Sequence, residues 1–95
     1  MPPTAEPEHL SNHHRTTLRQ IFQHPVSHNI EWHAVVSLLE AIGSVERHHD
    51  GTVAVKVGPE SAFFDPPVHK DTDIETLVRL RRMLAAAGYG PEPRD

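Results

Sequence analysis

The chain has 95 residues and a mass of 10.7 kDa, which is enough for one small domain and too little for two. It contains no cysteine, which excludes disulfides and cysteine nucleophiles, and its longest apolar run covers five residues, far fewer than the roughly 20 of a membrane helix. The formal net charge is −4, and residues 15–90 carry eight basic and nine acidic side chains, so the domain lacks the basic excess typical of nucleic-acid binders.

Both ends of the chain are rich in proline and polar residues. Residues 1–14 and 91–95 are therefore predicted to be disordered tails around a single domain, residues 15–90. The N-terminal segment has no basic flank followed by an apolar stretch, as an export signal has, so we expect a cytoplasmic protein.

Apolar residues at helical spacing predict two helices in the first half of the domain. A short helix covers about residues 16–23 and ends before Pro25. A stronger one covers residues 32–42 and is followed by Gly43, a residue typical of helix ends. Its apolar stripe consists of Trp32, Val35, Val36, Leu39 and Ile42.

From residue 44 on, apolar residues alternate with polar or small ones, which predicts β-strands. The dipeptide Asp50-Gly51 separates two such segments and is a strong hairpin signal. The alternating apolar residues are Val45, Val53, Val55 and Val57. After a turn at residues 58–60, residues 61–65 predict a short third strand at an edge of the sheet.

A last helix follows the loop at residues 66–71. Thr72-Asp73-Ile74-Glu75 has the form of a capping box, and apolar residues at helical spacing continue to Gly88. The element order is α-α-β-β-β-α, and the predicted fold class is α+β. We expect a two-layer sandwich in which the two longer helices cover one face of a three-stranded antiparallel sheet. The other face, with Ala54 and Lys56, is left for solvent or a partner.

Nine histidines are the first side chains that could carry chemistry. Adjacent histidines on a strand point to opposite faces, and Pro25 interrupts the helix that would bring His24 and His28 together. We therefore predict no metal site. Three histidines of the N-terminal tail are predicted to have no structural role: His9, His13 and His14.

Two basic groups are candidates for contacts with phosphate. His69 and Lys70 precede the last helix, whose dipole favours anions, but three carboxylates that follow them favour a purely structural loop. Three arginines on the last helix form either a solvated face or a phosphate-contacting patch: Arg79, Arg81 and Arg82. The sequence has no serine-nucleophile motif and no glycine-rich phosphate loop.

Four segments together resemble the HicA-like family of bacterial toxin–antitoxin proteins. They are Trp32-His33-Ala34-Val35-Val36-Ser37-Leu38-Leu39 with Ala41-Ile42-Gly43, Asp50-Gly51-Thr52-Val53-Ala54-Val55, Phe64 with Pro66, Pro67 and His69, and Val78-Arg79-Leu80-Arg81-Arg82-Met83-Leu84 with Ala87-Gly88-Tyr89. Residues 18–25 resemble the N-terminal extension of one branch of this family, so the match spans about residues 16–90. The resemblance implies a double-stranded-RNA-binding-like fold, metal-free cleavage of messenger RNA, and a HicB-type antitoxin as partner.

The resemblance also implies a catalytic histidine, which typical members carry in a Gly-Ser-His at the start of the second strand. The aligned stretch here is Gly51-Thr52-Val53, so the imidazole is missing, and valine cannot transfer a proton. His49 and His69 are the candidates to replace it. In metal-free cleavage one would deprotonate the 2′-hydroxyl and the other would protonate the leaving oxygen.

Together these features predict an RNA-binding domain of toxin–antitoxin origin with weak or lost ribonuclease activity, without cofactor, metal or membrane contact. The residues expected to contact RNA are Lys56, Lys70, Arg79 and Arg82. The alternative is a protein-interaction or dimerisation module without RNA binding. In that case the open sheet face or the third strand would pair with a HicB-like antitoxin or with a second copy of the chain.

Overall fold

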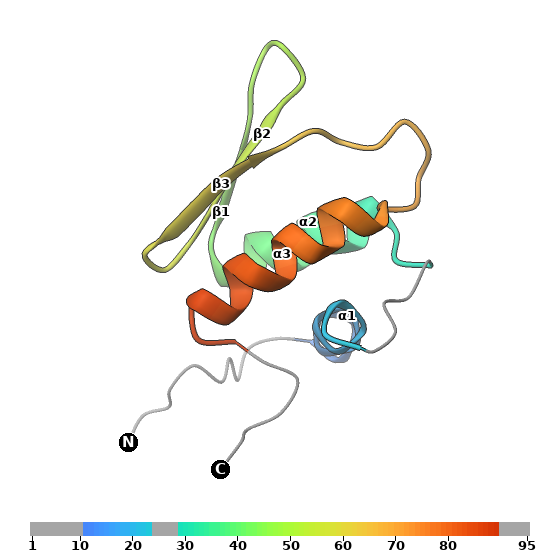
Figure 1. Ribbon diagram of the computed structural model, residues 1–95, viewed down its shortest axis with the longest axis vertical. Coiled ribbons are helices and arrows are strands. Elements are labelled where there is room, and N and C mark those ends of the chain that lie inside the picture. Colours follow the sequence, from blue (N-terminus) through green and yellow to red (C-terminus); the bar gives the residue numbers. More distant parts are fainter. Residues whose placement is uncertain (1–10, 24–28, 90–95) are drawn as a thin grey trace.

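A computed structural model describes residues 11–23 and 29–89 and places in them three helices and three strands (Figure 1). The elements are α1 (Asn12–Ile21), α2 (Trp32–Ile42), β1 (Ser44–Arg47), β2 (Val53–Val57), β3 (Glu60–Phe64) and α3 (Ile74–Ala86). The predicted α+β class and element order are confirmed. The expectations for residues 1–10 and 91–95, and those for His24 and His28, lie outside the described residues.

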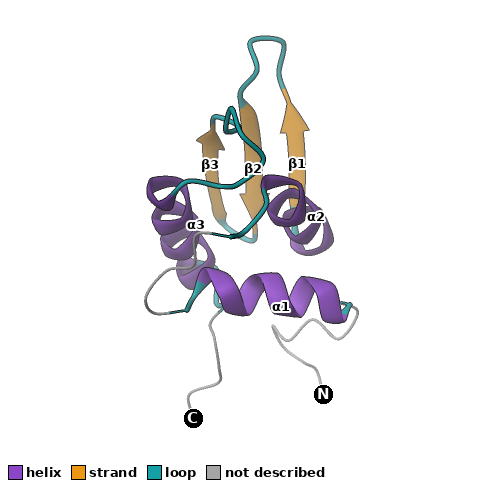
Figure 2. Ribbon diagram, turned by 90° about the vertical axis from the view of Figure 1, so that its right-hand side faces the viewer, coloured by secondary structure: helices purple, strands orange, loops and turns teal. Residues whose placement is uncertain are grey.

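The two longer helices cover one face of the sheet, as predicted. α2 contacts β1 and β2, and α3 contacts β3. α1 packs against α2 and α3 on the side that faces away from the sheet (Figure 2). The sandwich of sheet and helices therefore carries α1 as an additional layer.

β2 is the central strand of an antiparallel sheet with the order β1-β2-β3. Because side chains alternate along a strand, Val53, Val55 and Val57 all point toward the helices, and each is at most 2% exposed. Each such buried side chain contributes about 1.5–3 kcal/mol relative to an exposed one. The core that they share with both longer helices and α1 consists of Ile21, Ile30, Val35, Leu38, Leu39, Val53, Val55, Val57, Phe64, Leu77, Leu80, Met83 and Leu84.

The predicted hairpin turn at Asp50-Gly51 is confirmed. Gly51 has a φ of +97°, a conformation that favours glycine, and the amide of His48 donates to the carbonyl of Thr52 (2.9 Å). The Asp50 carboxylate accepts hydrogen bonds from the amide (3.0 Å) and hydroxyl (2.8 Å) of Thr52. These bonds stabilise the charged form and lower the pKa of Asp50.

The first helix begins earlier than predicted. Ser11 caps it by accepting a hydrogen bond from the amide of His14 (3.2 Å), so residues 12–14 belong to the helix and not to the tail. The expectation that His14 has no structural role is also wrong. A hydrogen bond between His14 Nε2 and Ser37 Oγ (2.7 Å) joins α1 to α2.

The end of α1 is completed by a side chain from α3. The guanidinium of Arg81 donates from Nε to the carbonyl of Ile21 (3.2 Å) and from Nη2 to that of Gln23 (3.0 Å). The last carbonyls of a helix have no partner within it, and here Arg81 supplies one. Arg81 is thus a structural residue that ties α1 to α3.

Gly43 allows α2 to approach the sheet closely. A Cβ atom at this position would overlap the backbone oxygen of Lys56 on β2. We expect Gly43→Ala to lower the free energy of unfolding by about 1–3 kcal/mol, because the backbone would have to move. The neighbouring exposed Ser44→Ala should change it by less than about 0.5 kcal/mol. Urea denaturation followed by circular dichroism measures both, and equal effects would contradict the close approach.

Candidate functional site

The two histidines proposed as substitutes for a catalytic residue lie on different loops. His49 is exposed in the turn between β1 and β2, and His69 is exposed in the loop between β3 and α3. The hydrogen bonds and ion pairs among the described residues include none between them. Their roles in catalysis therefore stay predictions.

The position at which the resemblance places the catalytic histidine is occupied by a core residue. Val53 opens β2, is 2% exposed and points toward the helices. It pairs with Arg47 on β1 and with Phe64 on β3. This position offers neither a group that can transfer a proton nor access for a substrate.

The starts of α2 and α3 are held together by the backbone at a junction formed by residues 30–32 and 70–72. The amide of Trp32 donates to the carbonyl of Lys70, and the amide of Thr72 donates to that of Ile30, both at 2.8 Å. A single antiparallel bridge between Glu31 and Asp71 lies between these bonds. The two helices therefore begin side by side, which their separation in the sequence does not reveal.

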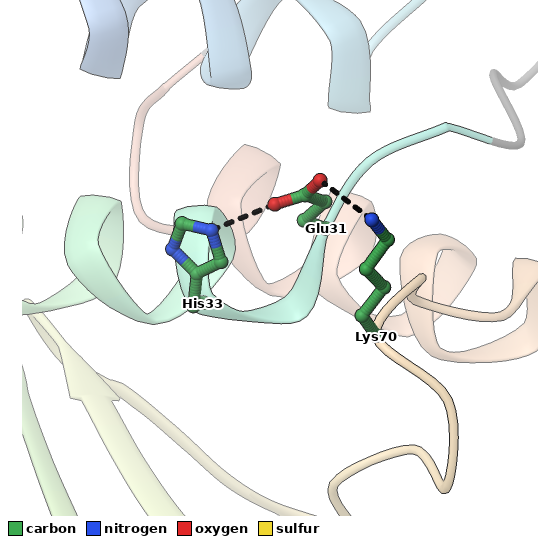
Figure 3. A network of polar contacts seen from close by, with 3 residues as sticks. All are labelled: Glu31, His33 and Lys70. Carbon is green, nitrogen blue, oxygen red and sulfur yellow. Dashed lines mark hydrogen bonds and ion pairs between the residues drawn. The ribbon is translucent and has the colours of Figure 1, made fainter.

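A polar network at this junction joins Glu31, His33 and Lys70 (Figure 3). One carboxylate oxygen of Glu31 lies 2.7 Å from His33 Nε2, and the other lies 3.7 Å from Lys70 Nζ. The side chains of His33 and Lys70 are 76% and 77% exposed, so the network contributes at most about 1 kcal/mol to stability. Sequence reasoning missed Glu31 and His33, whose only local signal is their two-residue spacing at the start of α2.

The chemistry of this network favours charge compensation over anion binding. Lys70 and a protonated His33 would offset the carboxylate of Glu31, while Asp71, Asp73 and Glu75 add negative charge nearby. Lys70, one of the predicted RNA contacts, is thus exposed but already shares an ion pair. A phosphate would have to compete with Glu31 for it.

The predicted capping box does not form at the start of α3. Asp73, not Thr72, caps the helix, and its carboxylate accepts a hydrogen bond from the amide of Thr76 (3.0 Å). Thr72 is 3% exposed and its hydroxyl has no partner, while its amide, which Glu75 would bind in a capping box, donates to the carbonyl of Ile30. The hydroxyl and amide of Thr76 hold the pKa of the Asp73 carboxyl below its ordinary value.

The other predicted RNA contacts lie on β2 and α3. Lys56 is exposed on the sheet face opposite the helices, and Arg82 is exposed on α3. Arg79 donates from Nη2 to the carbonyl of Phe63 (2.8 Å), and its guanidinium lies 4.6 Å from the centre of the Phe64 ring. Arg79 therefore also stabilises the outer edge of β3.

Within residues 11–23 and 29–89, no group of three or more histidine, aspartate or glutamate side chains is placed to hold a metal ion. Of the helices that the structure describes, none has both the length and the apolar character needed to cross a membrane. Comparisons with protein-family models, curated proteins and solved structures found no match to this chain. A function for this chain must therefore be inferred from the geometry described above and from the sequence resemblance.

The helix cap at Asp73 leads to a pH-dependent prediction. We expect Asp73→Ala to cost about 1 kcal/mol of unfolding free energy near neutral pH. Because the folded-state pKa of Asp73 is lowered, this contribution is present above its ordinary pKa of about 3.9 and is lost as pH falls through the lowered value. The difference between wild type and variant should therefore shrink below about pH 4.

Thr72→Val is the matched control. It replaces a buried hydroxyl without a partner by a methyl group of similar shape, so it should leave stability unchanged or raise it. Urea denaturation at several pH values measures both variants. If Thr72→Val instead lost about 1 kcal/mol of unfolding free energy and Asp73→Ala lost none, Thr72 and not Asp73 would be the cap of α3.

Proposed function

We propose that this chain is a small cytoplasmic HicA-like RNA-binding domain of toxin–antitoxin origin, with weak or no ribonuclease activity. The observation that carries this proposal is the arrangement of α2, β1, β2, β3 and α3, with both helices on one sheet face. The resemblance of residues 16–90 implies the same arrangement. The charge of the domain adds no support, because residues 15–90 are near neutral.

Two features support weak or absent catalysis. The position of the family's histidine holds the buried Val53. His49 and His69 lie on separate loops, and no hydrogen bond or ion pair joins either one to a carboxylate that would orient its ring within the described residues. Acid–base cleavage of RNA needs two groups placed on either side of one phosphate.

Binding itself would depend on exposed cations contacting phosphates. The proposed contacts are Lys56, Lys70, Arg79 and Arg82. Such contacts release counterions, so affinity should fall steeply with salt. Each lost phosphate contact should reduce the slope of the salt dependence by about one.

Fluorescence anisotropy with labelled single-stranded and duplex RNA at low and at physiological ionic strength tests the proposal. We expect salt-sensitive binding that the combined variant Lys56→Gln, Lys70→Gln and Arg82→Gln weakens, with a slope reduced by about three. Arg15→Gln with Arg19→Gln removes two exposed charges from α1 and should have little effect. Undetectable RNA binding at low salt would contradict the proposal.

The same samples report on catalysis. Gel electrophoresis of the RNA after long incubation should show intact strands, both for wild type and for His49→Ala with His69→Ala. Cleavage by wild type that the double variant abolishes would instead assign these histidines a catalytic role. Cleavage that survives in the double variant would exclude them from it.

A second function, a protein-interaction module, is favoured by one observation. Because the amide of His48 donates to the carbonyl of Thr52, the alternation of the ladder directs the backbone groups of Val45 and Arg47 away from β2. β1 thus has an open edge that a strand of a HicB-like antitoxin or of a second copy could join. A dimer mass in analytical ultracentrifugation, together with undetectable RNA binding, would favour this function.

A further inference from the structure

The sheet face opposite the helices carries an exposed aromatic side chain. The pairing register places six side chains on this outer sheet face: Ser44, Glu46, Ala54, Lys56, Ser61 and Phe63. Five of them are small or polar, as expected for a face in contact with water. The sixth, Phe63, is 60% exposed. The outer sheet face therefore presents one aromatic ring among polar neighbours.

Phe63 is not isolated on this face. Its ring meets the imidazole of His48 in a tilted, edge-type contact, with ring centres 5.8 Å apart and an interplanar angle of 69°. His48 directly follows β1 and Phe63 belongs to β3, so the pair reaches across β2. The residue opposite Phe63 on β2 is Ala54, whose small side chain leaves room for the two rings to meet.

One cation shares this face with the ring pair, and a second lies at the edge of β3. Lys56 pairs with Ser61, two residues before Phe63, so its exposed side chain lies on the same face one row away. Arg79 reaches the outer edge of β3 and binds the carbonyl of Phe63 through one of its five N–H donors (2.8 Å). Its guanidinium also lies over the ring of Phe64, so it could reach a phosphate only at the edge of β3.

Two carboxylates oppose this charge. Glu46 lies in the same row as Phe63, and its Oε1 is 4.0 Å from His48 Nε2. Its side chain is 79% exposed, so solvent screens its field. Asp50, in the turn that follows His48, also interacts electrostatically with His48, so the two carboxylates offset the charges of Lys56 and Arg79.

We propose that Phe63 and His48 form a stacking platform for the bases of unpaired RNA, with Lys56 and Arg79 contacting the adjacent phosphates. This proposal rests on the proposed RNA-binding function and names the form of RNA and the surface that receives it. Exposed aromatic side chains on a sheet, flanked by cations, suit single strands because every base has a face that can stack. Bases within a duplex are already stacked and cannot reach the ring.

Composition favours RNA over a protein partner on this face. The buried centre of a protein interface is enriched in apolar residues and depleted of charge. The outer sheet face offers one large apolar side chain, which is enough surface for a base but too little for such a centre. Lys56, one row from Phe63 on the same face, can also pair with a phosphate of a bound strand.

Affinity measurements with short single-stranded RNA and with a hairpin duplex of the same composition test the platform. Phe63→Ala should weaken single-strand binding roughly tenfold or more and change duplex binding little. Phe63→Leu, which retains apolar volume but removes the aromatic face, should weaken it similarly, whereas Phe63→Trp should preserve it. Val68→Ala is the matched control, since Val68 is 96% exposed and lies in the β3–α3 loop.

Two charge variants sharpen the test. Glu46→Gln should strengthen single-strand binding at low salt, and Lys56→Gln should reduce the salt slope by about one. Single-strand affinity that is equal in wild type and Phe63→Ala would overturn the platform while leaving RNA binding intact. Tighter binding of the duplex, or dimerisation that Phe63→Ala abolishes without changing RNA affinity, would overturn it as well. Absence of any RNA binding by wild type would instead remove the proposed function.

Discussion

The alternation of side chains along β2 is the constraint on which the rest of the structure depends. As the central strand, β2 has neighbours on both sides, so each of its residues must point either to the helices or to the outer face. Val53, Val55 and Val57 take the first direction and form the core with α2 and α3. Ala54 and Lys56 take the second and leave the outer face open. A register shift by one residue would exchange the two sets and remove the core.

The same constraint separates this chain from the family it resembles. The position that carries the catalytic histidine in typical members belongs here to the inward set, and Val53 fills it with an apolar side chain. The outer face carries Lys56 and Phe63, and the ring of His48 contacts Phe63. The surface proposed above for RNA lies on the opposite side of the sheet from Val53.

Local sequence patterns were sufficient to predict most of the fold. The apolar stripe of residues 32–42, the alternation of residues 53–57 and the Asp50-Gly51 turn each correspond to an observed element, because each signal lies within a few neighbouring residues. The missed features depend on contacts between distant segments. Thr72 was expected to cap α3, but its backbone is engaged by Ile30, so the cap falls to Asp73.

Site residues were harder to predict for the same reason. The ion pair of Glu31 with Lys70 exists only because two helix starts meet, and the contact of His48 with Phe63 exists only because both strands flank β2. Neither pair is close in sequence. The four basic residues expected to contact RNA were chosen from the sequence by their charge. The structure adds that Arg79 is also bound to β3.

The hydrogen bonds of Arg81 bear on the order in which the layers assemble. The carbonyl of Ile21 receives its donor from a side chain 60 residues further along the chain. α1 is only ten residues long, and helices of that length are marginal in water on their own. Its last turn is completed only when α3 is in place, so we expect α1 to join late in folding and to be the first part of the molecule to detach on mild destabilisation.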